Sequence, residues 1–320
     1  MAERTTGLQG SWRKGSTFSK APLRVLPLLC ALALSCSGCA PLSEGFLFSP
    51  AGPVAVAERH EALIVGIVLV FVFAPVALLV PLFAWYYRIG NKKAAYRPQW
   101  AFSWVLEFLI WVPPTALVVL LSVVLARYTV LLDPYRPIRS GAATPPLEVQ
   151  VVALDWKWLF IYPAQHVATV NTLVVPAGRP VHLSLTSGTV MQSLFMPRLA
   201  SQIYAMSGMR TQLNFEVAKP GLYAGENTQY NGDGFAEDKF TVNALSPAGF
   251  ANWASQLQAQ PQTLDAPAYT ALSVQSVLKT PPVYGRVEPD IFNRILAGQI
   301  PAGYSQEHQE QQQHHESGNG

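Results

Sequence analysis

Glu107 is the one charged residue in an apolar stretch that runs from about Trp104 to Ala126. A carboxyl group inside a membrane span is costly unless it faces protein or water, so such residues usually have a function. Proton transfer is the chemistry that a carboxylate offers there. The alternative interpretation is that Glu107 lies near the membrane surface, close to Trp100 and Trp104, and reaches water from there.

A second group of polar residues could supply ligands for a metal ion. It consists of two histidines and four carboxylates, His166, His182, Glu226, Asp233, Glu237 and Asp238. His182 is on the polar side of an alternating segment, His166 is in a predicted turn, and the carboxylates fall in a glycine-rich loop. Hard ligands scattered on a loop lack the fixed geometry that a metal site needs. We therefore interpret these side chains as solvated surface residues.

The three cysteines, Cys30, Cys36 and Cys39, lie near the N-terminus, in or just after an apolar run at residues 25–35. Basic residues precede this run and small residues follow it, which is the layout of a secretory signal peptide. The sequence Ser-Gly-Cys at 37–39 resembles a lipoprotein cleavage site, so we predict a signal peptide at 1–38 and a lipidated Cys39. Cys36 departs from the lipoprotein pattern, and an uncleaved anchor is the alternative. A chain cut before Cys39 would keep no disulfide and no cysteine-based metal site.

Composition indicates a chain that is partly embedded in a membrane, because 50% of its 320 residues are hydrophobic and 13% are charged. Residues 62–87 and 102–127 are predicted to form two transmembrane helices, since each run can cross a hydrocarbon core of ~30 Å at ~1.5 Å per residue. The intervening loop, 88–101, has four basic and no acidic residues. This predicts a cytoplasmic loop, with segments 39–61 and 128–146 outside. A net charge of +3 without a long basic run argues against nucleic acid as a partner.

The region 147–245 follows a different pattern, in which apolar and polar residues alternate. Leu147, Val149 and Val151 alternate with Glu148 and Gln150, and similar alternation follows at 181–186 and 212–217. Short strands at this spacing, separated by Pro- and Gly-containing turns, predict an all-β sandwich. Residues 246–300 are predicted to be a helical extension, beginning at the Ser-Pro pair 246–247. The polar tail at 301–320 has too little apolar surface to fold.

Three stretches carry a resemblance to a known family. They read Glu-Phe-Leu-Ile-Trp-Val-Pro-Pro at 107–114, Asp-Trp-Lys-Trp-Leu-Phe-Ile-Tyr at 155–162, and Val-Met-Gln-Ser-Leu-Phe-Met-Pro-Arg-Leu-Ala-Ser-Gln-Ile-Tyr-Ala-Met-Ser-Gly-Met at 190–209. Together they resemble subunit II of haem-copper oxidases, and the last stretch is closest to the quinol oxidases of the cytochrome bo type. The resemblance covers roughly residues 39–302, and it implies a transmembrane hairpin with a cupredoxin-like outer domain.

The resemblance also implies where a copper centre would lie if the chain had one. In relatives that oxidise cytochrome c, two Cys, two His, a Met and a carbonyl hold a copper pair. The matching positions here are Gln192 for the first His, Glu226 and Tyr230 for the two Cys, and Gly234 for the second His, with Glu237 or Asp238 near the Met position. Soft thiolates are what make such a site tight and redox-active. The resemblance therefore implies that this subunit binds no cofactor and that the haems and copper belong to subunit I.

In this family, a glutamate with Trp at four and Pro at seven residues downstream lies at the mouth of a proton channel. Glu107, Trp111 and Pro114 match that register, although Val112 and the extra Pro113 depart from it. The implied function is that of an accessory subunit, in the bacterial inner membrane, of a proton-translocating complex that oxidises quinol and reduces oxygen. Its partners would be subunit I, the other oxidase subunits and, through the complex, quinol.

Two alternatives are weighed against this function. One is a copper-bearing subunit II of cytochrome c oxidase, which the missing Cys and His residues oppose. The other is a membrane-tethered lipoprotein scaffold without enzymatic activity, which leaves Glu107 and the match at 190–209 unexplained.

Overall fold

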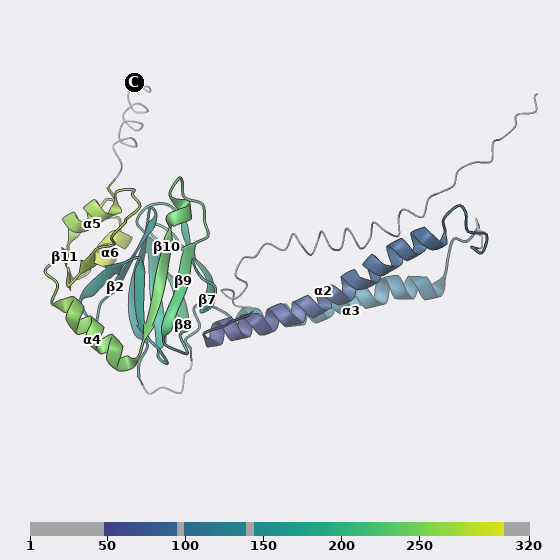
Figure 1. Cartoon of the computed structure of the whole chain (residues 1–320), viewed down its shortest axis with the longest axis horizontal. Helices are drawn as coiled ribbons and strands as arrows, with labels where there is room; N and C mark the ends of the chain where they lie inside the picture. Colours follow the sequence, from purple (N-terminus) through teal and green to yellow (C-terminus); the bar gives the residue numbers. More distant parts are fainter. Residues whose placement is uncertain (1–47, 95–98, 139–143, 304–320) are drawn as a thin grey trace, which may run out of the picture. The chain divides into compact units, whose positions relative to one another are not determined.

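The computed structural model describes residues 48–94, 99–138 and 144–303. The predicted signal peptide, the predicted lipidation site Cys39 and nearly all of the polar tail lie outside these ranges. Two long helices, α2 (Pro53–Tyr86) and α3 (Trp104–Leu131), run side by side and are joined by a short connection (Figure 1). Both are long and apolar enough to cross a membrane.

Both helices extend beyond the predicted spans. The first begins at Pro53 rather than at residue 62, and the second continues to Leu131 rather than ending at 127. A proline is well suited to the first helical position, and no helix breaker separates it from the apolar run. The predicted spans 62–87 and 102–127 stay predictions, because a helix can continue past the end of its membrane-spanning segment into water. Along α2 only Ala55 is buried, and along α3 no residue is.

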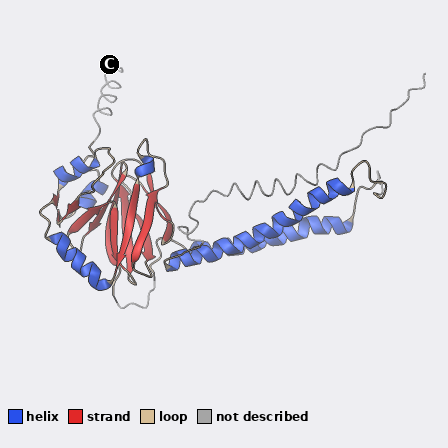
Figure 2. Ribbon diagram, viewed as in Figure 1, coloured by secondary structure: helices blue, strands red, loops and turns tan. Residues whose placement is uncertain are grey.

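The predicted sandwich is confirmed as two facing sheets (Figure 2). The first has the order β12-β3-β2-β1-β5-β8. Its members are β1 (Leu147–Leu154), β2 (Lys157–Tyr162), β3 (Val167–Val170), β5 (Pro180–Ser187), β8 (Thr211–Glu216) and, from the C-terminal extension, β12 (Val283–Tyr284). The second has the order β4-β10-β9-β6-β7, and consists of β4 (Thr172–Pro176), β10 (Lys239–Leu245), β9 (Gly221–Asn227), β6 (Gln192–Met196) and β7 (Ala200–Ala205). A short 3-10 helix, η2 (Phe235–Glu237), precedes β10.

The C-terminal extension, predicted to be helical at 246–300, contains three helices and three two-residue strands. Its helices are α4 (Pro247–Gln258), α5 (Ala266–Ser273) and α6 (Ile291–Leu296), and its short strands are β11 (Thr263–Leu264), β12 (Val283–Tyr284) and β13 (Arg286–Val287). The side chain of Ser246 caps α4 by accepting a hydrogen bond from Gly249 N at 3.1 Å. Strand β12 pairs with β3 and so extends the first sheet. Two-residue strands have no readable alternation, and their pairing depends on a partner far away in the sequence.

Two apolar cores explain the burial of the first sheet. The larger core lies between the sheets and includes Trp158, Phe160 and Phe240. The second lies between the other face of this sheet and the extension, where Leu159 and Ile161 pack with Phe292 and neighbouring residues. Strand β2 is therefore buried at all its positions, because both of its faces are covered.

Hydrogen bonds join the ends of the hairpin to the outer domain. Before α2, Ala51 N donates to Arg198 O at 2.8 Å, and Ala51 O accepts from Ala218 N at 2.9 Å. After α3, Pro134 O accepts from both Asn214 N and Asn214 Nδ2, each at 3.0 Å. Gly52 passes so close to Glu216 O that any Cβ at this position would collide with it.

Candidate functional site

Glu107 lies in the first turn of α3 and is partly exposed. Its Oε2 accepts a hydrogen bond from Trp111 Nε1 at 3.1 Å. Residues four apart meet on one face of a helix, so this pair follows from the spacing in the sequence. A carboxylate in the first turn also interacts favourably with the positive end of the helix dipole. Pro113 and Pro114 lie within α3, and the helix continues through both.

The four positions that match copper ligands in relatives lie at one end of the second sheet. Gln192 begins β6, Glu226 is near the end of β9, and Tyr230 and Gly234 are in the loop between β9 and β10. Strands β6 and β9 pair, with Phe195 opposite Glu226. Gln192 is fully buried, whereas Tyr230 is 68% exposed. The structure therefore brings these four positions to one end of the sandwich.

The indole of Trp156 fills the space beside Gly234. Any Cβ at Gly234 would collide with this ring, so an imidazole there would have to displace the tryptophan. Trp156 Nε1 donates to Asn231 O at 3.2 Å, which fixes the ring against the loop. The other positions offer an amide, a carboxylate and a phenol in place of thiolates and an imidazole. These residues do not fit a binuclear copper centre.

Asp238 is fully buried, so the prediction of a solvated carboxylate was wrong for this residue. Its Oδ2 accepts hydrogen bonds from Asn227 Nδ2 at 2.9 Å and from Asn231 Nδ2 at 3.0 Å. Burial raises the pKa of Asp238 to about 6, and the nearby Asp155 adds to this shift, while the asparagine amides oppose it. The two asparagines come from β9 and from the loop after it, so Asp238 holds the loop in place.

The other candidate ligands do not gather around Asp238. Glu226 is partly exposed, and Asp233 and Glu237 are exposed. His182 Nδ1 lies 2.9 Å from Asn214 Oδ1 on the neighbouring strand, and His166 is in the turn between β2 and β3. Within the described ranges, no three His, Cys, Asp or Glu side chains are arranged to hold a metal ion.

Lys157 is a buried residue that the sequence analysis missed. It is fully buried at the start of β2, and its Nζ donates to Leu272 O at 3.0 Å, Val274 O at 2.6 Å and Ser276 Oγ at 2.8 Å. Burial lowers the pKa of Lys157 to about 8, against the opposing effect of Asp155 and Asp238. Its place between Trp156 and Trp158 was the available signal, because a lysine within an apolar strand needs partners when both faces are covered.

Comparison with known proteins gives the family of the chain. Residues 149–243 match the family model described as cytochrome C oxidase subunit II, periplasmic domain. The chain is 41% identical to ubiquinol oxidase subunit 2 of Acetobacter aceti over 266 residues, which cover 83% of this chain and 85% of the relative. It is 39% identical to cytochrome bo(3) ubiquinol oxidase subunit 2 of Pseudomonas putida, over 85% of this chain and 84% of the relative.

Among solved structures, the periplasmic domain of subunit II of the Bradyrhizobium japonicum cytochrome oxidase matches with 18% identity and a TM-score of 0.35, over 38% of this chain and 96% of that one. The sequence relatives extend over most of the chain, including the hairpin, and they carry the assignment. The chain thus belongs to the family of quinol oxidase subunits II, with a cupredoxin-like outer domain of the cytochrome oxidase subunit II type.

Proposed function

We propose that this chain is subunit II of a bacterial terminal oxidase that oxidises quinol. The outer domain of this subunit would hold no copper centre. The complex would transfer electrons from quinol to oxygen, forming water, and the haems and copper that carry them would be in subunit I. The observation that supports this most is that Gln192, Glu226, Tyr230 and Gly234 offer no thiolate or imidazole to copper. The Trp156 ring also fills the space beside Gly234. Electrons from cytochrome c would have no acceptor in such a domain.

The proposed location is the bacterial inner membrane, with two spans and the outer domain in the periplasm. The two apolar helices support the spans. The four basic residues of the connecting loop, with no acidic residue among them, support a cytoplasmic position for that loop. This orientation puts Glu107, in the first turn of α3, near the cytoplasmic surface.

Glu107 is proposed to take up protons from the cytoplasm at the entrance of a channel that leads to the oxygen-reducing centre. Its carboxylate is partly exposed at the beginning of the helix, where water can reach it. The hydrogen bond from Trp111 Nε1 would keep the carboxylate in one orientation while protons arrive and leave. The subunit would also brace the complex through its outer domain.

Cys39 is proposed to be the acylated N-terminus of the mature chain, as the Ser-Gly-Cys sequence indicates. Mass spectrometry of the mature subunit should find a chain that begins at Cys39 with attached acyl groups. A chain that begins at Met1, or a free thiol at Cys39, would refute this processing without affecting the proposed function.

Co-purification is the experiment that tests the proposed function. The full chain, tagged at its C-terminus and solubilised from its native membrane, should bring down a large polytopic subunit with haem absorption bands in stoichiometric amount. A chain that purifies alone from well-preserved membranes, or with partners that lack haem, would instead support the alternative of a tethered scaffold.

A further inference from the structure

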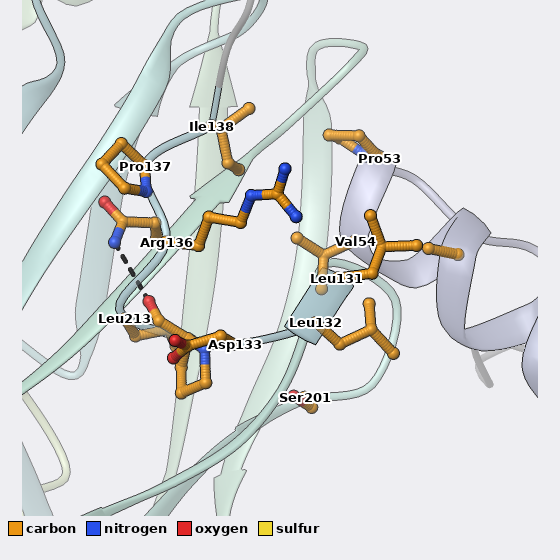
Figure 3. A pocket seen from close by; sticks show the side chains of 13 residues that line it. Pro53, Val54, Leu131, Leu132, Asp133, Arg136, Pro137, Ile138, Ser201 and Leu213 are labelled. Carbon is orange, nitrogen blue, oxygen red and sulfur yellow. Dashed lines mark hydrogen bonds between the residues drawn. The ribbon is translucent and has the colours of Figure 1, made fainter. Parts of the chain in front are cut away.

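A small hollow lies where the hairpin meets the outer domain (Figure 3). It is bounded by the beginning of α2, the end of α3, the segment that follows α3, and strand β8. Its volume is about 220 Å³. Pockets for complete drug-sized ligands are larger, at roughly 300–1,000 Å³, so this hollow suits only one part of a larger molecule.

Two oppositely charged side chains line this hollow. The guanidinium group of Arg136 extends into it (Figure 3). Its Nη1 donates a long hydrogen bond to Val130 O at 3.4 Å. Asp133 Oδ1 accepts from Tyr135 N at 3.0 Å. Neither Arg136 nor Asp133 forms an ion pair with any residue that the structure describes. Both charges can therefore interact with a ligand.

The beginning of α2 adds partial positive charge to the same wall. This helix has 34 residues, its N-cap is Gly52, and no side chain caps its first turn. The first N–H groups of a helix have no partner within it, and the aligned peptide dipoles concentrate positive charge there. Together with Arg136, this helix end favours an anionic group such as a phosphate.

Most of the other lining residues are apolar, with Ser201 and Asn214 as polar exceptions. Leu131 and Leu132 extend the apolar surface of α3, whereas Glu58, Arg59 and Glu61 separate Pro53 and Val54 from the apolar part of α2. A ligand held here would have its charged part against Arg136 and Asp133 and its apolar part along α3. A free inorganic anion matches only the Arg136 side, because Asp133 and the apolar walls would disfavour it.

We propose that the hollow binds the headgroup of a zwitterionic phospholipid, phosphatidylethanolamine, from the outer leaflet. Arg136 and the beginning of α2 bind its phosphate, Asp133 faces its ammonium group, and its acyl chains follow the apolar surface of α3. This proposal goes beyond the proposed function and depends only on the proposed membrane orientation. It assigns to this subunit one structural lipid at the junction of its membrane and periplasmic parts.

The proposal is tested on the purified whole complex, delipidated and then supplied with a photoactivatable phosphatidylethanolamine. Labelling of the peptide that contains residues 131–138 is measured by mass spectrometry. Arg136→Gln should lower the apparent affinity of this labelling by about tenfold, as expected for a lost charge-assisted bond. Asp133→Asn should shift the preference toward phosphatidylglycerol, whose headgroup has no ammonium. Arg127→Gln, on α3 but outside the hollow, should leave the labelling unchanged.

Three results would overturn the proposal. One is labelling of residues 131–138 that is insensitive to Arg136→Gln. Another is that phosphatidylethanolamine and phosphatidylglycerol compete equally with the photoactivatable lipid in the unmodified complex. A third is that inorganic phosphate at the same concentration displaces the photoactivatable lipid, which would indicate a simple anion site. Haem content is measured in each variant as a test of an intact complex. If Arg136→Gln lowers the haem content, Arg136→Lys is tested in its place. That variant retains the charge and should keep about the same preference for phosphatidylethanolamine if the proposal is correct.

Discussion

Trp111 donates a hydrogen bond from its indole Nε1 to Glu107 Oε2 at 3.1 Å, across one turn of α3. The bond lies at the beginning of the helix, where Glu107 is partly exposed. A hydrogen bond to a carboxylate restricts its orientation. The pair can therefore hold the carboxylate in one orientation, as the proposed proton uptake requires.

Glu107→Gln should leave assembly and haem content intact and slow quinol oxidation. The amide has nearly the same size, but it cannot take up and release a proton. Turnover should fall by about tenfold or more if the carboxyl group lowers the limiting barrier by at least ~1.4 kcal/mol. Glu107→Asp should have a smaller effect, because it keeps the carboxyl group and shifts it by one methylene.

Glu61→Gln is the matched control for this measurement, because Glu61 lies on α2 near the opposite end of the hairpin. Activity is expressed per haem in the purified complexes. Normal activity of Glu107→Gln at normal haem content would show that Glu107 only reaches the membrane surface. Loss of the complex would instead assign it a structural role in docking.

Lys157→Met should loosen the C-terminal extension from the sandwich. The change removes three hydrogen bonds and leaves Leu272 O and Val274 O without this donor, so the free energy of unfolding of this part should fall by about 2 kcal/mol or more. Hydrogen exchange at residues 263–300 of the full chain measures the effect. Lys239→Met, which replaces an exposed lysine of β10, should leave the exchange unchanged. Equal exchange in both variants would mean that apolar packing alone holds the extension.

The stability of the outer domain should depend on pH through Asp238. Its pKa rises from 3.8 when unfolded to about 6 when folded, so the proton is bound more tightly in the folded state. The resulting stabilisation is fully present below pH ~4 and is lost as the pH rises through about 6, by on the order of 3 kcal/mol. Thermal unfolding of the full chain in detergent, followed by near-ultraviolet circular dichroism, should show a lower midpoint at pH 7.5 than at pH 5.

The variant Asp238→Asn separates this carboxyl group from the other acids of the chain. It should flatten the pH dependence between 5 and 7.5, because an amide does not titrate in this range. Asp233→Asn, an exposed residue of the same loop, should retain the dependence. The same slope in both variants would trace the pH dependence to other groups.

Much of the fold could be predicted from local patterns. The strands begin at Leu147, where the alternation of apolar and polar residues begins, and the Ser246 side chain caps α4 as the Ser-Pro pair indicates. The contact between Glu107 and Trp111 follows from their spacing of four within a helix. These features depend on nearest neighbours along the chain, which the sequence displays directly.

The features that were missed depend on contacts between distant segments. Asp238 was interpreted as a surface residue, because nothing near it in the sequence shows that the loop folds over it. The tryptophans beside Lys157 indicate burial, but they do not show which distant carbonyl groups receive its hydrogen bonds. The alternation in β1 is lost in its second half for the same reason, since the extension packs against the face that would otherwise be solvated. The fit between Trp156 and Gly234 likewise joins two loops of the sandwich.

Quinol and reduced cytochrome c, offered separately to the purified complex that contains this chain, distinguish the two kinds of oxidase. Oxygen consumption should proceed with a short-chain ubiquinol, be abolished by a haem ligand such as cyanide, and be absent with reduced cytochrome c. Because the Trp156 ring lies where a second histidine ligand would be, the complex should also lack the near-infrared absorption of a binuclear copper pair. Sustained oxidation of cytochrome c together with that absorption would contradict a quinol oxidase subunit without copper.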